Sequence, residues 1–379
     1  MSATKAGTKI TFFSQSLQRT GSEIVLYQLL RHLDVSFNPS LVSFFKGELA
    51  DELATIPQTT IYSSKPGGSF LSRLNHYLER EFGMPRKLKA FHDSVWYVNT
   101  IALPDVVSYA KKNKIRLLVH VHELEQMFEL LSEERIRNLV EYPEWIIANS
   151  EASKLVLNKY GRKDRISVCY PCMDTTLVRR DEALYNTKRK ELGFVSGDFL
   201  WLMSGTLDRN KNPFLFMEAA SLLLKQQPHA RFAWLGGTSD TTFEQECKER
   251  CKALNLQDRF TWLGSMGKEY TASFNCADGF MLSSRKESFS LATLEALLLG
   301  LPVVANDCGG VSELLQTDIG KIVSSDNRAQ GLATEMERYM NKEWMVDIEK
   351  QRQRAMQFDV NTIAPRWNNL LAQILNRKG

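Results

Sequence analysis

The sequence predicts two doubly wound, Rossmann-like α/β domains that face each other across a cleft. Three observations support this fold class. The chain has 379 residues, which is enough for two domains of ordinary size. Short apolar runs alternate with segments of helical periodicity along the whole chain. Most of the runs have apolar residues at consecutive positions, which is typical of parallel strands covered by helices on both faces.

The runs that predict strands fall into two series. The first series is Lys9–Ser14, Ser40–Phe45, Ser94–Asn99, Leu117–His122, Trp145–Asn149 and Ile166–Tyr170. The second series is Phe199–Ser204, Arg231–Leu235, Phe260–Leu263, Gly279–Leu282, Val303–Asn306 and Lys321–Val323. Apolar stripes at helical spacing lie between them, at Ile24–Leu33, Pro213–Gln226, Thr241–Leu254, Leu291–Leu299 and Arg328–Met340.

The domain boundary is expected where strand character is lost. Thr175–Glu191 is charged and has no strand pattern, so we place the linker near it. This gives an N-terminal domain at residues 1–175 and a C-terminal domain at residues 190–360. An amphipathic pattern from Thr362 to Leu375 predicts a last helix, and we expect residues 361–379 to pack back on the N-terminal domain.

The composition excludes several classes of protein. Forty-eight basic against 44 acidic residues leave a net charge of +4, which is too small to indicate a nucleic-acid partner. No segment has the apolar length of a membrane span, and residues 1–16 lack a secretory signal pattern. We therefore expect a cytoplasmic protein.

Two cysteine pairs leave one metal alternative open. Cys169 and Cys172 have CxxC spacing, and Cys247 and Cys251 are four residues apart on a helical pattern. Together they could form a four-thiolate zinc site. We favour core packing, because the first pair ends an apolar strand and the second lies in a charged helix. No metal is therefore expected.

The most informative segment follows the predicted strand Gly279–Leu282. A polar turn leads to a helix that begins near Ser290, a residue type that suits an N-cap. The free backbone N–H groups of Leu291 and Ala292, at the positive end of the helix dipole, would suit a phosphate.

Two carboxylates accompany this helix. Glu287 precedes it, and Glu295 lies about one and a half turns inside it. Such placement lets one carboxylate reach a sugar and the other reach ribose hydroxyls, with phosphates between them. Glu295 is flanked by apolar residues, and burying a carboxylate there is costly unless it has a partner. Taken alone, Glu287 could equally be a solvated partner of the helix dipole.

An ordered set of motifs runs through the chain. It comprises Val121-His122-Glu123, Pro171–Asp174, Gly205–Asn212, Glu287-x7-Glu295 and the following Gly300, Pro302–Ala305 and Gly309-Gly310. This set resembles retaining glycosyltransferase family four, which has the GT-B fold. The resemblance covers nearly the whole chain and is strongest from Gly205 to Gly320.

The resemblance implies transfer of a sugar, a hexosyl or related group, from a nucleotide-diphosphate sugar with retention of configuration. Enzymes of the alternative GT-A fold use Asp-x-Asp to hold a metal, and that motif does not occur in this chain. We expect positive groups of the protein to neutralise the leaving diphosphate instead, without a metal or other cofactor. The donor would bind the C-terminal domain, and the acceptor would bind the N-terminal one.

Roles then follow for individual residues. The expected catalytic residues are Glu287, His122 and Lys211. The expected donor-binding residues are Glu295, Arg209, Gly205, Ser290, Leu291 and Gly21. Arg209 could also face solvent, His120 could be an ordinary strand histidine, and Gly21 could simply be a turn glycine.

Three positions depart from the family pattern. Thr206 stands where arginine is common, Phe289-Ser290 where glycine usually follows the aromatic residue or proline, and Cys172-Met173 where Asn-Gly is usual. None removes a proposed catalytic group, but all could alter the fit of the donor.

The acceptor and the location stay open on the sequence alone. Phe70–Lys89 is amphipathic and basic, so it could dock on an anionic membrane that carries a lipid-linked acceptor, or it could be an ordinary packed helix. Two other functions are also compatible with the fold: a nucleotide-sugar epimerase and a non-catalytic binding protein.

Overall fold

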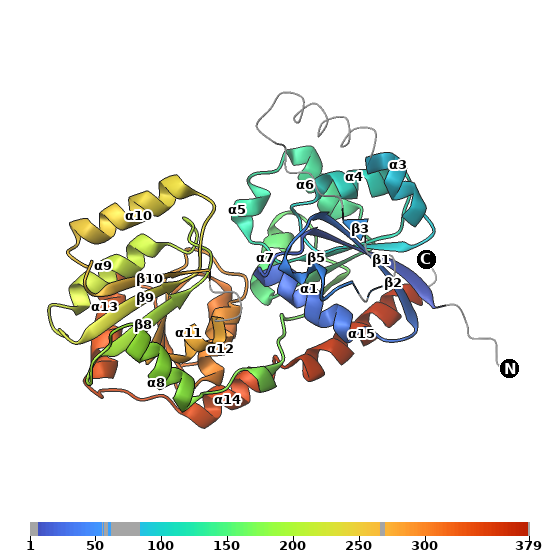
Figure 1. Cartoon of the computed structure of the whole chain (residues 1–379). Helices are drawn as coiled ribbons and strands as arrows, with labels where there is room; N and C mark the ends of the chain where they lie inside the picture. Colours follow the sequence, from blue (N-terminus) through green and yellow to red (C-terminus); the bar gives the residue numbers. More distant parts are fainter. Residues whose placement is uncertain (1–6, 55, 57–59, 62–83, 266–269, 378–379) are drawn as a thin grey trace. The chain divides into compact units, whose positions relative to one another are not determined.

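The computed structural model describes residues 7–54, 56, 60–61, 84–265 and 270–377. The chain divides into two compact units (Figure 1). The first unit contains residues 1–173 and 360–379, and the second contains residues 174–359.

The first unit is built on a seven-stranded sheet of order β3-β2-β1-β4-β5-β6-β7, in which every neighbouring pair is parallel. Its strands are β1 (Thr8–Ser16), β2 (Phe37–Phe45), β3 (Thr60–Ile61), β4 (Val95–Val98), β5 (Leu117–Val121), β6 (Trp145–Ala148) and β7 (Ile166–Val168). Its helices are α1 (Gly21–Arg31), α3 (Met84–Leu88), α4 (Pro104–Lys112), α5 (Glu125–Phe128), α6 (Glu133–Glu141), α7 (Glu151–Lys159) and α15 (Val360–Leu375), with short 3-10 turns at η1 (Glu48–Ala50) and η3 (Lys89–Phe91).

The core of this unit follows from its apolar strands. All four residues of β4 and all five of β5 are buried, as expected for strands covered on both faces. The last helix, α15, supplies Trp367, which is fully buried and donates from Nε1 to the Tyr97 hydroxyl at 3.0 Å. The end of the chain therefore forms part of the core of the first unit.

The second unit contains a six-stranded parallel sheet of order β10-β9-β8-β11-β12-β13. Its strands are β8 (Phe199–Ser204), β9 (Ala230–Leu235), β10 (Phe260–Gly264), β11 (Gly279–Leu282), β12 (Val303–Asn306) and β13 (Lys321–Val323). Its helices are α8 (Glu182–Glu191), α9 (Pro213–Leu223), α10 (Thr241–Ala253), α11 (Tyr270–Asn275), α12 (Leu291–Leu298), α13 (Arg328–Met340) and α14 (Ile348–Met356), with 3-10 turns at η4 (Thr175–Leu177) and η6 (Gly310–Glu313). The predicted fold class, two doubly wound α/β domains, is confirmed.

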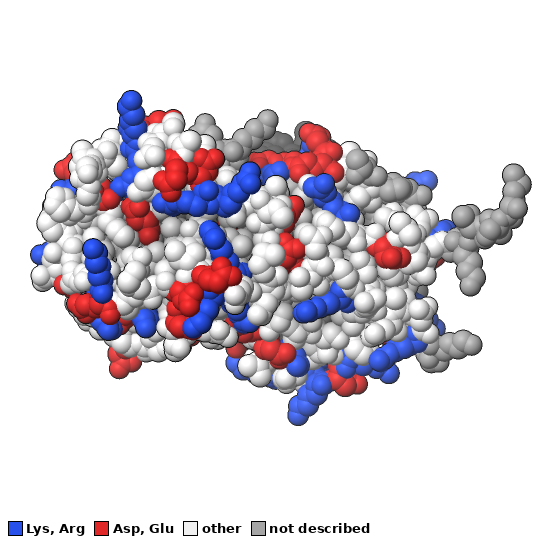
Figure 2. Space-filling view, turned by 90° about the horizontal axis from the view of Figure 1, so that it is seen from below, with Lys and Arg blue, Asp and Glu red and all other residues white. Residues whose placement is uncertain are grey.

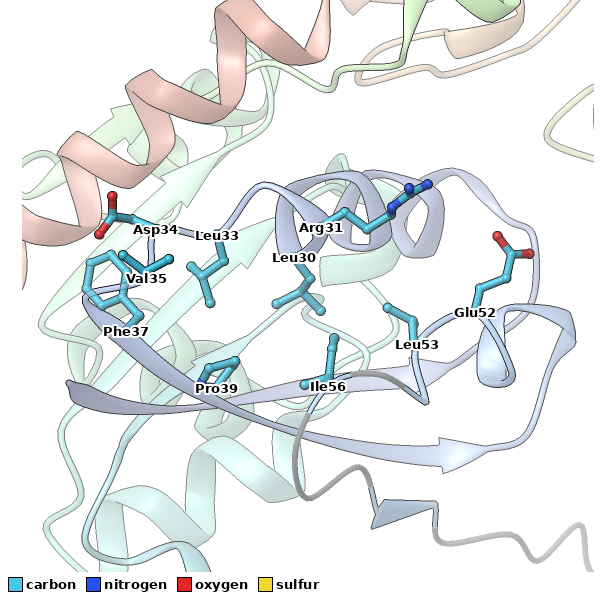
Figure 3. Close-up of a pocket in the computed structure, with 10 residues that line it drawn as sticks. All are labelled: Leu30, Arg31, Leu33, Asp34, Val35, Phe37, Pro39, Glu52, Leu53 and Ile56. Carbon is cyan, nitrogen blue, oxygen red and sulfur yellow. The ribbon is translucent and has the colours of Figure 1, made fainter. Parts of the chain in front are cut away.

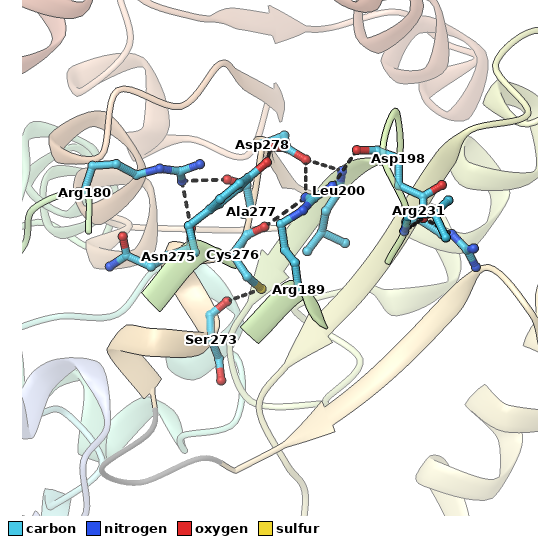
Figure 4. Close-up of polar contacts among 12 residues, drawn as sticks. Arg180, Arg189, Asp198, Leu200, Arg231, Ser273, Asn275, Cys276, Ala277 and Asp278 are labelled. Atoms are coloured by element: carbon cyan, nitrogen blue, oxygen red, sulfur yellow. Dashed lines mark hydrogen bonds and ion pairs between the residues drawn. The ribbon is translucent and has the colours of Figure 1, made fainter. Parts of the chain in front are cut away.

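The segment expected to be a linker is instead part of the second unit. It contains α8, which is held to the sheet by partly buried charged side chains (Figure 4). Arg189 lies 2.6 Å from the Asp278 carboxylate and donates to the Asp198 carbonyl, also at 2.6 Å. Asp278 in turn accepts from the Leu200 N–H in β8 at 2.8 Å. The charge pattern that suggested a linker therefore belongs to an anchored helix.

Both sheets reverse their strand order at one point. In the first unit the reversal lies between β1 and β4, and in the second it lies between β8 and β11. Ligands of open α/β sheets bind outside the carboxyl ends of the strands at such points. The residues that follow β1 and β4, and those that follow β8 and β11, are therefore the places to look for a site.

The surface carries charges of both signs. On the face shown in Figure 2, basic and acidic side chains are interspersed rather than gathered into one field. Among the described residues, no helix is both long enough and apolar enough to cross a bilayer. Residues 70–83 of the proposed membrane-docking stretch lie outside the described part of the chain, and the rest of that stretch enters α3 and η3.

Candidate functional site

Two loops meet at the reversal point of the second unit. One follows β8 and contains Lys211, and the other follows β11. Ser283 donates from Oγ to the Lys211 carbonyl at 2.7 Å. The Arg285 N–H donates to the Asn210 carbonyl at 2.7 Å, and the Asn210 side chain donates to the Lys286 carbonyl at 2.9 Å. These contacts fix the two loops against each other and set the positions of their charged side chains.

The loops bring Lys211 and Glu287 together. Lys211 Nζ lies 2.5 Å from Glu287 Oε1, and the same oxygen accepts from Ser284 Oγ at 2.7 Å. The Lys211 side chain is 24% exposed and that of Glu287 is 9% exposed. Burial alone would lower the pKa of Lys211, but the Glu287 carboxylate outweighs it and raises that pKa above its ordinary value. The ammonium is therefore fully charged at neutral pH.

Gly205 makes room for this lysine. It has a φ of +156°, and a Cβ at this position would lie only 3.1 Å from Lys211 Cε. A side chain at this position would force the lysine stem to shift by a few tenths of an ångström, and the positive φ also favours glycine.

The backbone of Glu287 is fixed from the other side. Its N–H donates to the Cys308 carbonyl at 2.8 Å, and its carbonyl accepts from the Gly310 N–H at 2.7 Å. A Cβ at Gly310 would come within 1.8 Å of the Ser288 carbonyl oxygen. Gly309, with a φ of +105°, and Gly310, which has no room for a side chain, thus both suit the turn against which Glu287 is held.

Glu295, the second predicted carboxylate, belongs to a separate hydrogen-bonded group at the same edge of the sheet. Tyr270 donates to Glu295 Oε2 at 2.6 Å, and its oxygen lies 3.0 Å from Ser204 Oγ at the end of β8. Because the Tyr270 proton goes to the carboxylate, Ser204 is the donor to Tyr270. Burial raises the pKa of Glu295 to about 7, although the bond from Tyr270 opposes this change. Burial, and then the Glu295 charge, raise the pKa of Tyr270 well above its usual range.

The amino terminus of α12 completes the arrangement. Ser290 is the N-cap, and its Oγ accepts from the Thr293 N–H at 3.2 Å and from Thr293 Oγ1 at 2.9 Å. Within the described residues, the N–H groups of Leu291 and Ala292 have no acceptor. They carry the partial positive charge of the helix end and can bind an anion.

Arg209 does not join this group. Its guanidinium is exposed, pairs with Glu246 of α10 at 2.9 Å and lies 4.7 Å above the Phe243 ring. The structure thus places Lys211, Glu287, Glu295, Ser290 and Leu291 around the ends of β8 and β11, and it directs Arg209 to α10.

Gly21 follows β1, which borders the reversal point of the first unit, and His122 follows β5, the neighbour of β4. Nε2 of His122 is 3.1 Å from Asn99 Oδ1. Burial lowers the pKa of His122 to about 3, so its ring is neutral at pH 7. His120 is fully buried inside β5 and pairs with the Tyr97 hydroxyl at 2.8 Å, which is the contact of a core histidine. Gly21 begins α1, and a Cβ there would meet no atom within 4 Å, so packing within this chain does not require glycine.

Neighbouring carboxylates were not predicted as site residues. Glu123 accepts from the Thr100 hydroxyl and from the His122 N–H, the latter at 2.8 Å, and burial raises its pKa to about 7. Glu23 in the first turn of α1 is 7% exposed and accepts from three hydroxyl groups. A charged residue directly after an apolar strand was the signal that could have identified Glu123.

The last candidates are the four cysteines of the alternative zinc site. Within the described residues, no group of three or more His, Cys, Asp or Glu side chains could hold a metal ion. Cys169 and Cys172 are buried in the first unit, and Cys247 and Cys251 are buried in the second.

A pocket of about 320 Å³ opens in the first unit (Figure 3). It lies beside the connection from α1 to β2 and is lined mainly by apolar side chains such as Leu30, Leu53 and Ile56. This connection leads to the amino end of β2. The pocket therefore lies at the edge opposite the one where ligands of such sheets bind.

Comparison with known proteins decides the family. A model described as Glycosyltransferase Family 4 matches residues 19–177, and one described as Glycosyl transferases group 1 matches residues 185–357. The chain belongs to glycosyltransferase family 4. The resemblance drawn from the sequence motifs is thereby confirmed.

Curated relatives match over part of their length. A D-inositol 3-phosphate glycosyltransferase from Pseudarthrobacter chlorophenolicus is 33% identical over 175 residues, which is 45% of this chain and 41% of the relative. A mannosylfructose-phosphate synthase from Agrobacterium fabrum is 34% identical over 129 residues, or 32% of this chain and 28% of the relative. The matched segment thus spans less than half of each of these relatives.

Solved structures match over nearly the whole chain. The Anabaena protein Alr3699/HepE in complex with UDP-glucose has a TM-score of 0.82 at 21% identity, covering 96% of this chain and 99% of that one. A sucrose-phosphate synthase from Thermosynechococcus elongatus has a TM-score of 0.76 at 17% identity, covering 97% and 99%. At these identities the likeness shows the shared fold, which is GT-B.

Proposed function

We propose that this family 4 glycosyltransferase moves a hexosyl or related group from a nucleotide-diphosphate sugar to an acceptor hydroxyl, with retention of configuration and without a metal ion. The observation that carries the proposal is the Lys211–Glu287 pair beside the exposed amino end of α12. A cation and a helix end suit the diphosphate of such a donor, and the two carboxylates at the same sheet edge, Glu287 and Glu295, suit its two sets of hydroxyls.

The diphosphate is assigned to Lys211 and the N–H groups of Leu291 and Ala292. As the bond to the sugar breaks, negative charge grows on the leaving phosphate, and fixed positive groups stabilise it. Arg209 would have to leave Glu246 and Phe243 to take part. The proposal therefore gives this role to the lysine and the helix and leaves Arg209 out.

The two carboxylates take hydroxyl groups. Glu287 is buried and is held on both sides through its backbone, so it would accept hydroxyls of the transferred sugar. In Glu295, Tyr270 occupies Oε2, and the other carboxylate oxygen would accept a ribose hydroxyl.

Donor binding would exchange one ion pair for another. Without donor, Lys211 and Glu287 neutralise each other in a poorly solvated place, which avoids an unpaired buried charge. An arriving diphosphate attracts the ammonium and releases Glu287 for the sugar. The pair thus keeps the empty site organised while both groups stay available.

Retention is proposed to follow from attack on the same face that the phosphate leaves, with the departing phosphate taking the acceptor proton. His122 and the open end of α1 at Gly21 are assigned to the sugar and the acceptor. The acceptor class stays wide: a glycan, a lipid-linked sugar at the cytoplasmic membrane surface, or a small molecule. An acceptor screen therefore includes both water-soluble sugars and lipid-linked sugars in vesicles.

Donor binding is the first experiment. Thermal melting of the purified chain is recorded with UDP-, GDP- and TDP-sugars, with EDTA present. A ligand at about 100 times its Kd adds about 2.7 kcal/mol to stability, which raises Tm by about 5–10 °C in a unit of this size. One nucleotide family should give this shift. The absence of a shift with every nucleotide sugar, with or without Mg²⁺, would refute the proposal.

Analysis of the reaction products distinguishes sugar transfer from the two alternative functions. NMR of the anomeric proton in the product should show the configuration of the donor sugar. Release of an epimerised sugar without an acceptor would identify an epimerase instead. Binding without turnover across the acceptor screen would indicate a non-catalytic protein.

A further inference from the structure

Tyr270 links a strand end to a helix in the second unit. It is the first residue of α11. Its hydroxyl donates to Glu295 Oε2 on α12 at 2.6 Å and lies 3.0 Å from Oγ of Ser204, the last residue of β8. Ser204 is buried, so this end of the hydrogen-bonded chain is anchored inside the protein.

The core fixes the direction of this hydroxyl. The ring centre of Tyr270 lies 5.8 Å from that of Phe274, one turn later in α11. Phe274 stacks in turn on Phe280 of β11, with 5.6 Å between the ring centres, and both of these rings are buried. Aromatic side chains packed in this way lose little further freedom when they make a polar contact. The Tyr270 hydroxyl is therefore a rigid donor.

The bond from Tyr270 acts on both the charge and the orientation of Glu295. Burial raises the pKa of Glu295 to about 7, and the Tyr270 hydroxyl opposes this rise and so favours the charged carboxylate. Hydrogen bonds to a charged acceptor are roughly twice as strong as those between neutral groups. A carboxylate held by such a bond at one oxygen presents the other oxygen in a defined direction, and that oxygen can only accept.

The second oxygen of Glu295 is placed to meet a nucleotide. Glu295 is partly exposed, and within the described part of the chain its Oε1 has no hydrogen-bond partner. Glu295 lies four residues after Leu291, on the same face of α12 and about 6 Å further along the helix. Helical side chains tilt toward the amino end, where the N–H groups of Leu291 and Ala292 can bind an anion. A phosphate at the helix end would therefore bring the neighbouring ribose to Glu295.

We propose that Tyr270 is a positioning residue that holds the Glu295 carboxylate for a ribose hydroxyl and so makes the site prefer ribonucleotide to deoxyribonucleotide donors. This inference rests on the proposed function, which gives the ribose to Glu295, and it adds the residue that orients the carboxylate and the class of the donor. A donor without that hydroxyl leaves a partly buried carboxylate oxygen without its partner, and such a loss discriminates strongly. TDP-sugars, which contain deoxyribose, should therefore bind more weakly than the matching ribonucleotide sugars.

Titration calorimetry of the full chain tests the preference. UDP and GDP are each compared with their 2′-deoxy and 3′-deoxy forms at pH 8, where most of Glu295 is charged. The unmodified chain should bind one ribonucleotide about 10–100-fold more tightly than one of its deoxy forms, the scale of a hydrogen bond to a charged group. Tyr270→Phe keeps the ring and removes the hydroxyl. It should weaken the ribonucleotide about tenfold and that deoxy form less than about twofold.

A matched variant controls for the loss of a tyrosine hydroxyl. Tyr185 of α8 also donates to a carboxylate, Asp278 Oδ1, at 2.8 Å. Asp278 precedes β11, so this pair lies at the opposite edge of the sheet from the proposed donor site. Tyr185→Phe should leave both the nucleotide affinity and the preference for the ribonucleotide unchanged.

A third variant tests the anchor of the chain. Ser204→Ala removes the hydroxyl behind Tyr270 but keeps the bond from Tyr270 to Glu295. It should reduce the preference by about two- to threefold, less than Tyr270→Phe does. Circular dichroism and chemical denaturation confirm that each variant is folded before its affinities are compared.

Kinetics give the second readout. Because the ribose is bound alike in the ground state and the transition state, Tyr270→Phe should raise the donor KM about tenfold and leave kcat nearly unchanged. An unchanged preference in folded Tyr270→Phe, an equal loss of affinity for both forms, or no preference in the unmodified chain would overturn the inference while leaving the proposed function in place. A failure of every nucleoside diphosphate to bind would instead refute the proposed function, and the inference with it.

Discussion

Replacing Lys211 by methionine removes the ammonium 2.5 Å from Glu287 while keeping most of the side-chain volume. Glu287 would keep the Ser284 hydroxyl but lose its counter-charge. Breaking a buried ion pair from one side costs about 3–5 kcal/mol, and the partial exposure of this lysine reduces the expected loss to about 2–3 kcal/mol. Chemical denaturation measures that loss of unfolding free energy.

The same substitution should weaken transfer more than it weakens folding. A unit charge about 4 Å from a phosphate charge contributes about 4 kcal/mol at an effective dielectric constant of about 20. Because part of that energy is screened by solvent, we expect kcat/KM to fall about 10²–10³-fold. Steady-state kinetics with the donor found by thermal melting give this number.

A double variant separates the two effects. Lys211→Met with Glu287→Gln leaves no unpaired charge, so stability should return to within about 1 kcal/mol of the unmodified protein, while activity should stay low. Lys248→Met is the control, because Lys248 forms an exposed pair with Glu244 on α10 and should change stability by less than about 1 kcal/mol. Full activity in the single Lys211 variant, or recovery of activity in the double one, would refute the reasoning.

Three further predictions concern Glu295, Arg189 and Gly21. The pKa of Glu295 is about 7 in the folded protein against an ordinary value of 4.5, so the folded state binds more protons and stability falls as pH rises through this window. Glu295→Gln should make the unfolding free energy depend less on pH, as measured by chemical denaturation between pH 4.5 and 8. An unchanged slope of unfolding free energy against pH would contradict this. Arg189→Ala leaves Asp278 without its cation and should lower the unfolding free energy of the second unit by about 3 kcal/mol. A loss below about 1 kcal/mol in denaturant would show that α8 is held by other contacts. Gly21→Ala meets no atom within 4 Å, so Tm should stay unchanged while KM rises, and an unchanged KM would remove Gly21 from the site.

The fold was largely predictable because its strands are buried on both faces. In such strands, for example Leu117–Val121, apolar residues do not have to alternate with polar ones. The regular succession of strands and helices along the chain is then compatible with few folds. The two-residue strand β3 gave no such signal. The segment containing α8 was misjudged, because its charges suit a linker as well as a helix. Its long-range contacts, such as that of Arg189 with Asp278, 89 residues away in sequence, and those of Arg180 with the Asn275 and Ala277 carbonyls, show that it belongs to the second unit.

Residues that stand in a sequence motif could be picked out as candidates from the sequence, whereas their hydrogen-bond partners on distant segments could not. Lys211 and Glu287 each stand in a motif, and the structure brings them together. The partner of Glu295 is Tyr270, 25 residues earlier, and that of His122 is Asn99, 23 residues earlier. Arg209 has the right charge in the right loop, but the acidic and aromatic side chains of α10 attract it. The residue type predicts which chemistry a side chain can perform, whereas its neighbours in the fold determine where that side chain points.

A crystal structure with a bound nucleoside diphosphate tests the central claim most directly. We expect phosphate oxygens within hydrogen-bond distance of Lys211 Nζ and of the N–H groups of Leu291 and Ala292, with the Lys211–Glu287 contact lengthened. A nucleotide bound elsewhere in the second unit, with that ion pair intact and the amino end of α12 empty, would contradict the account.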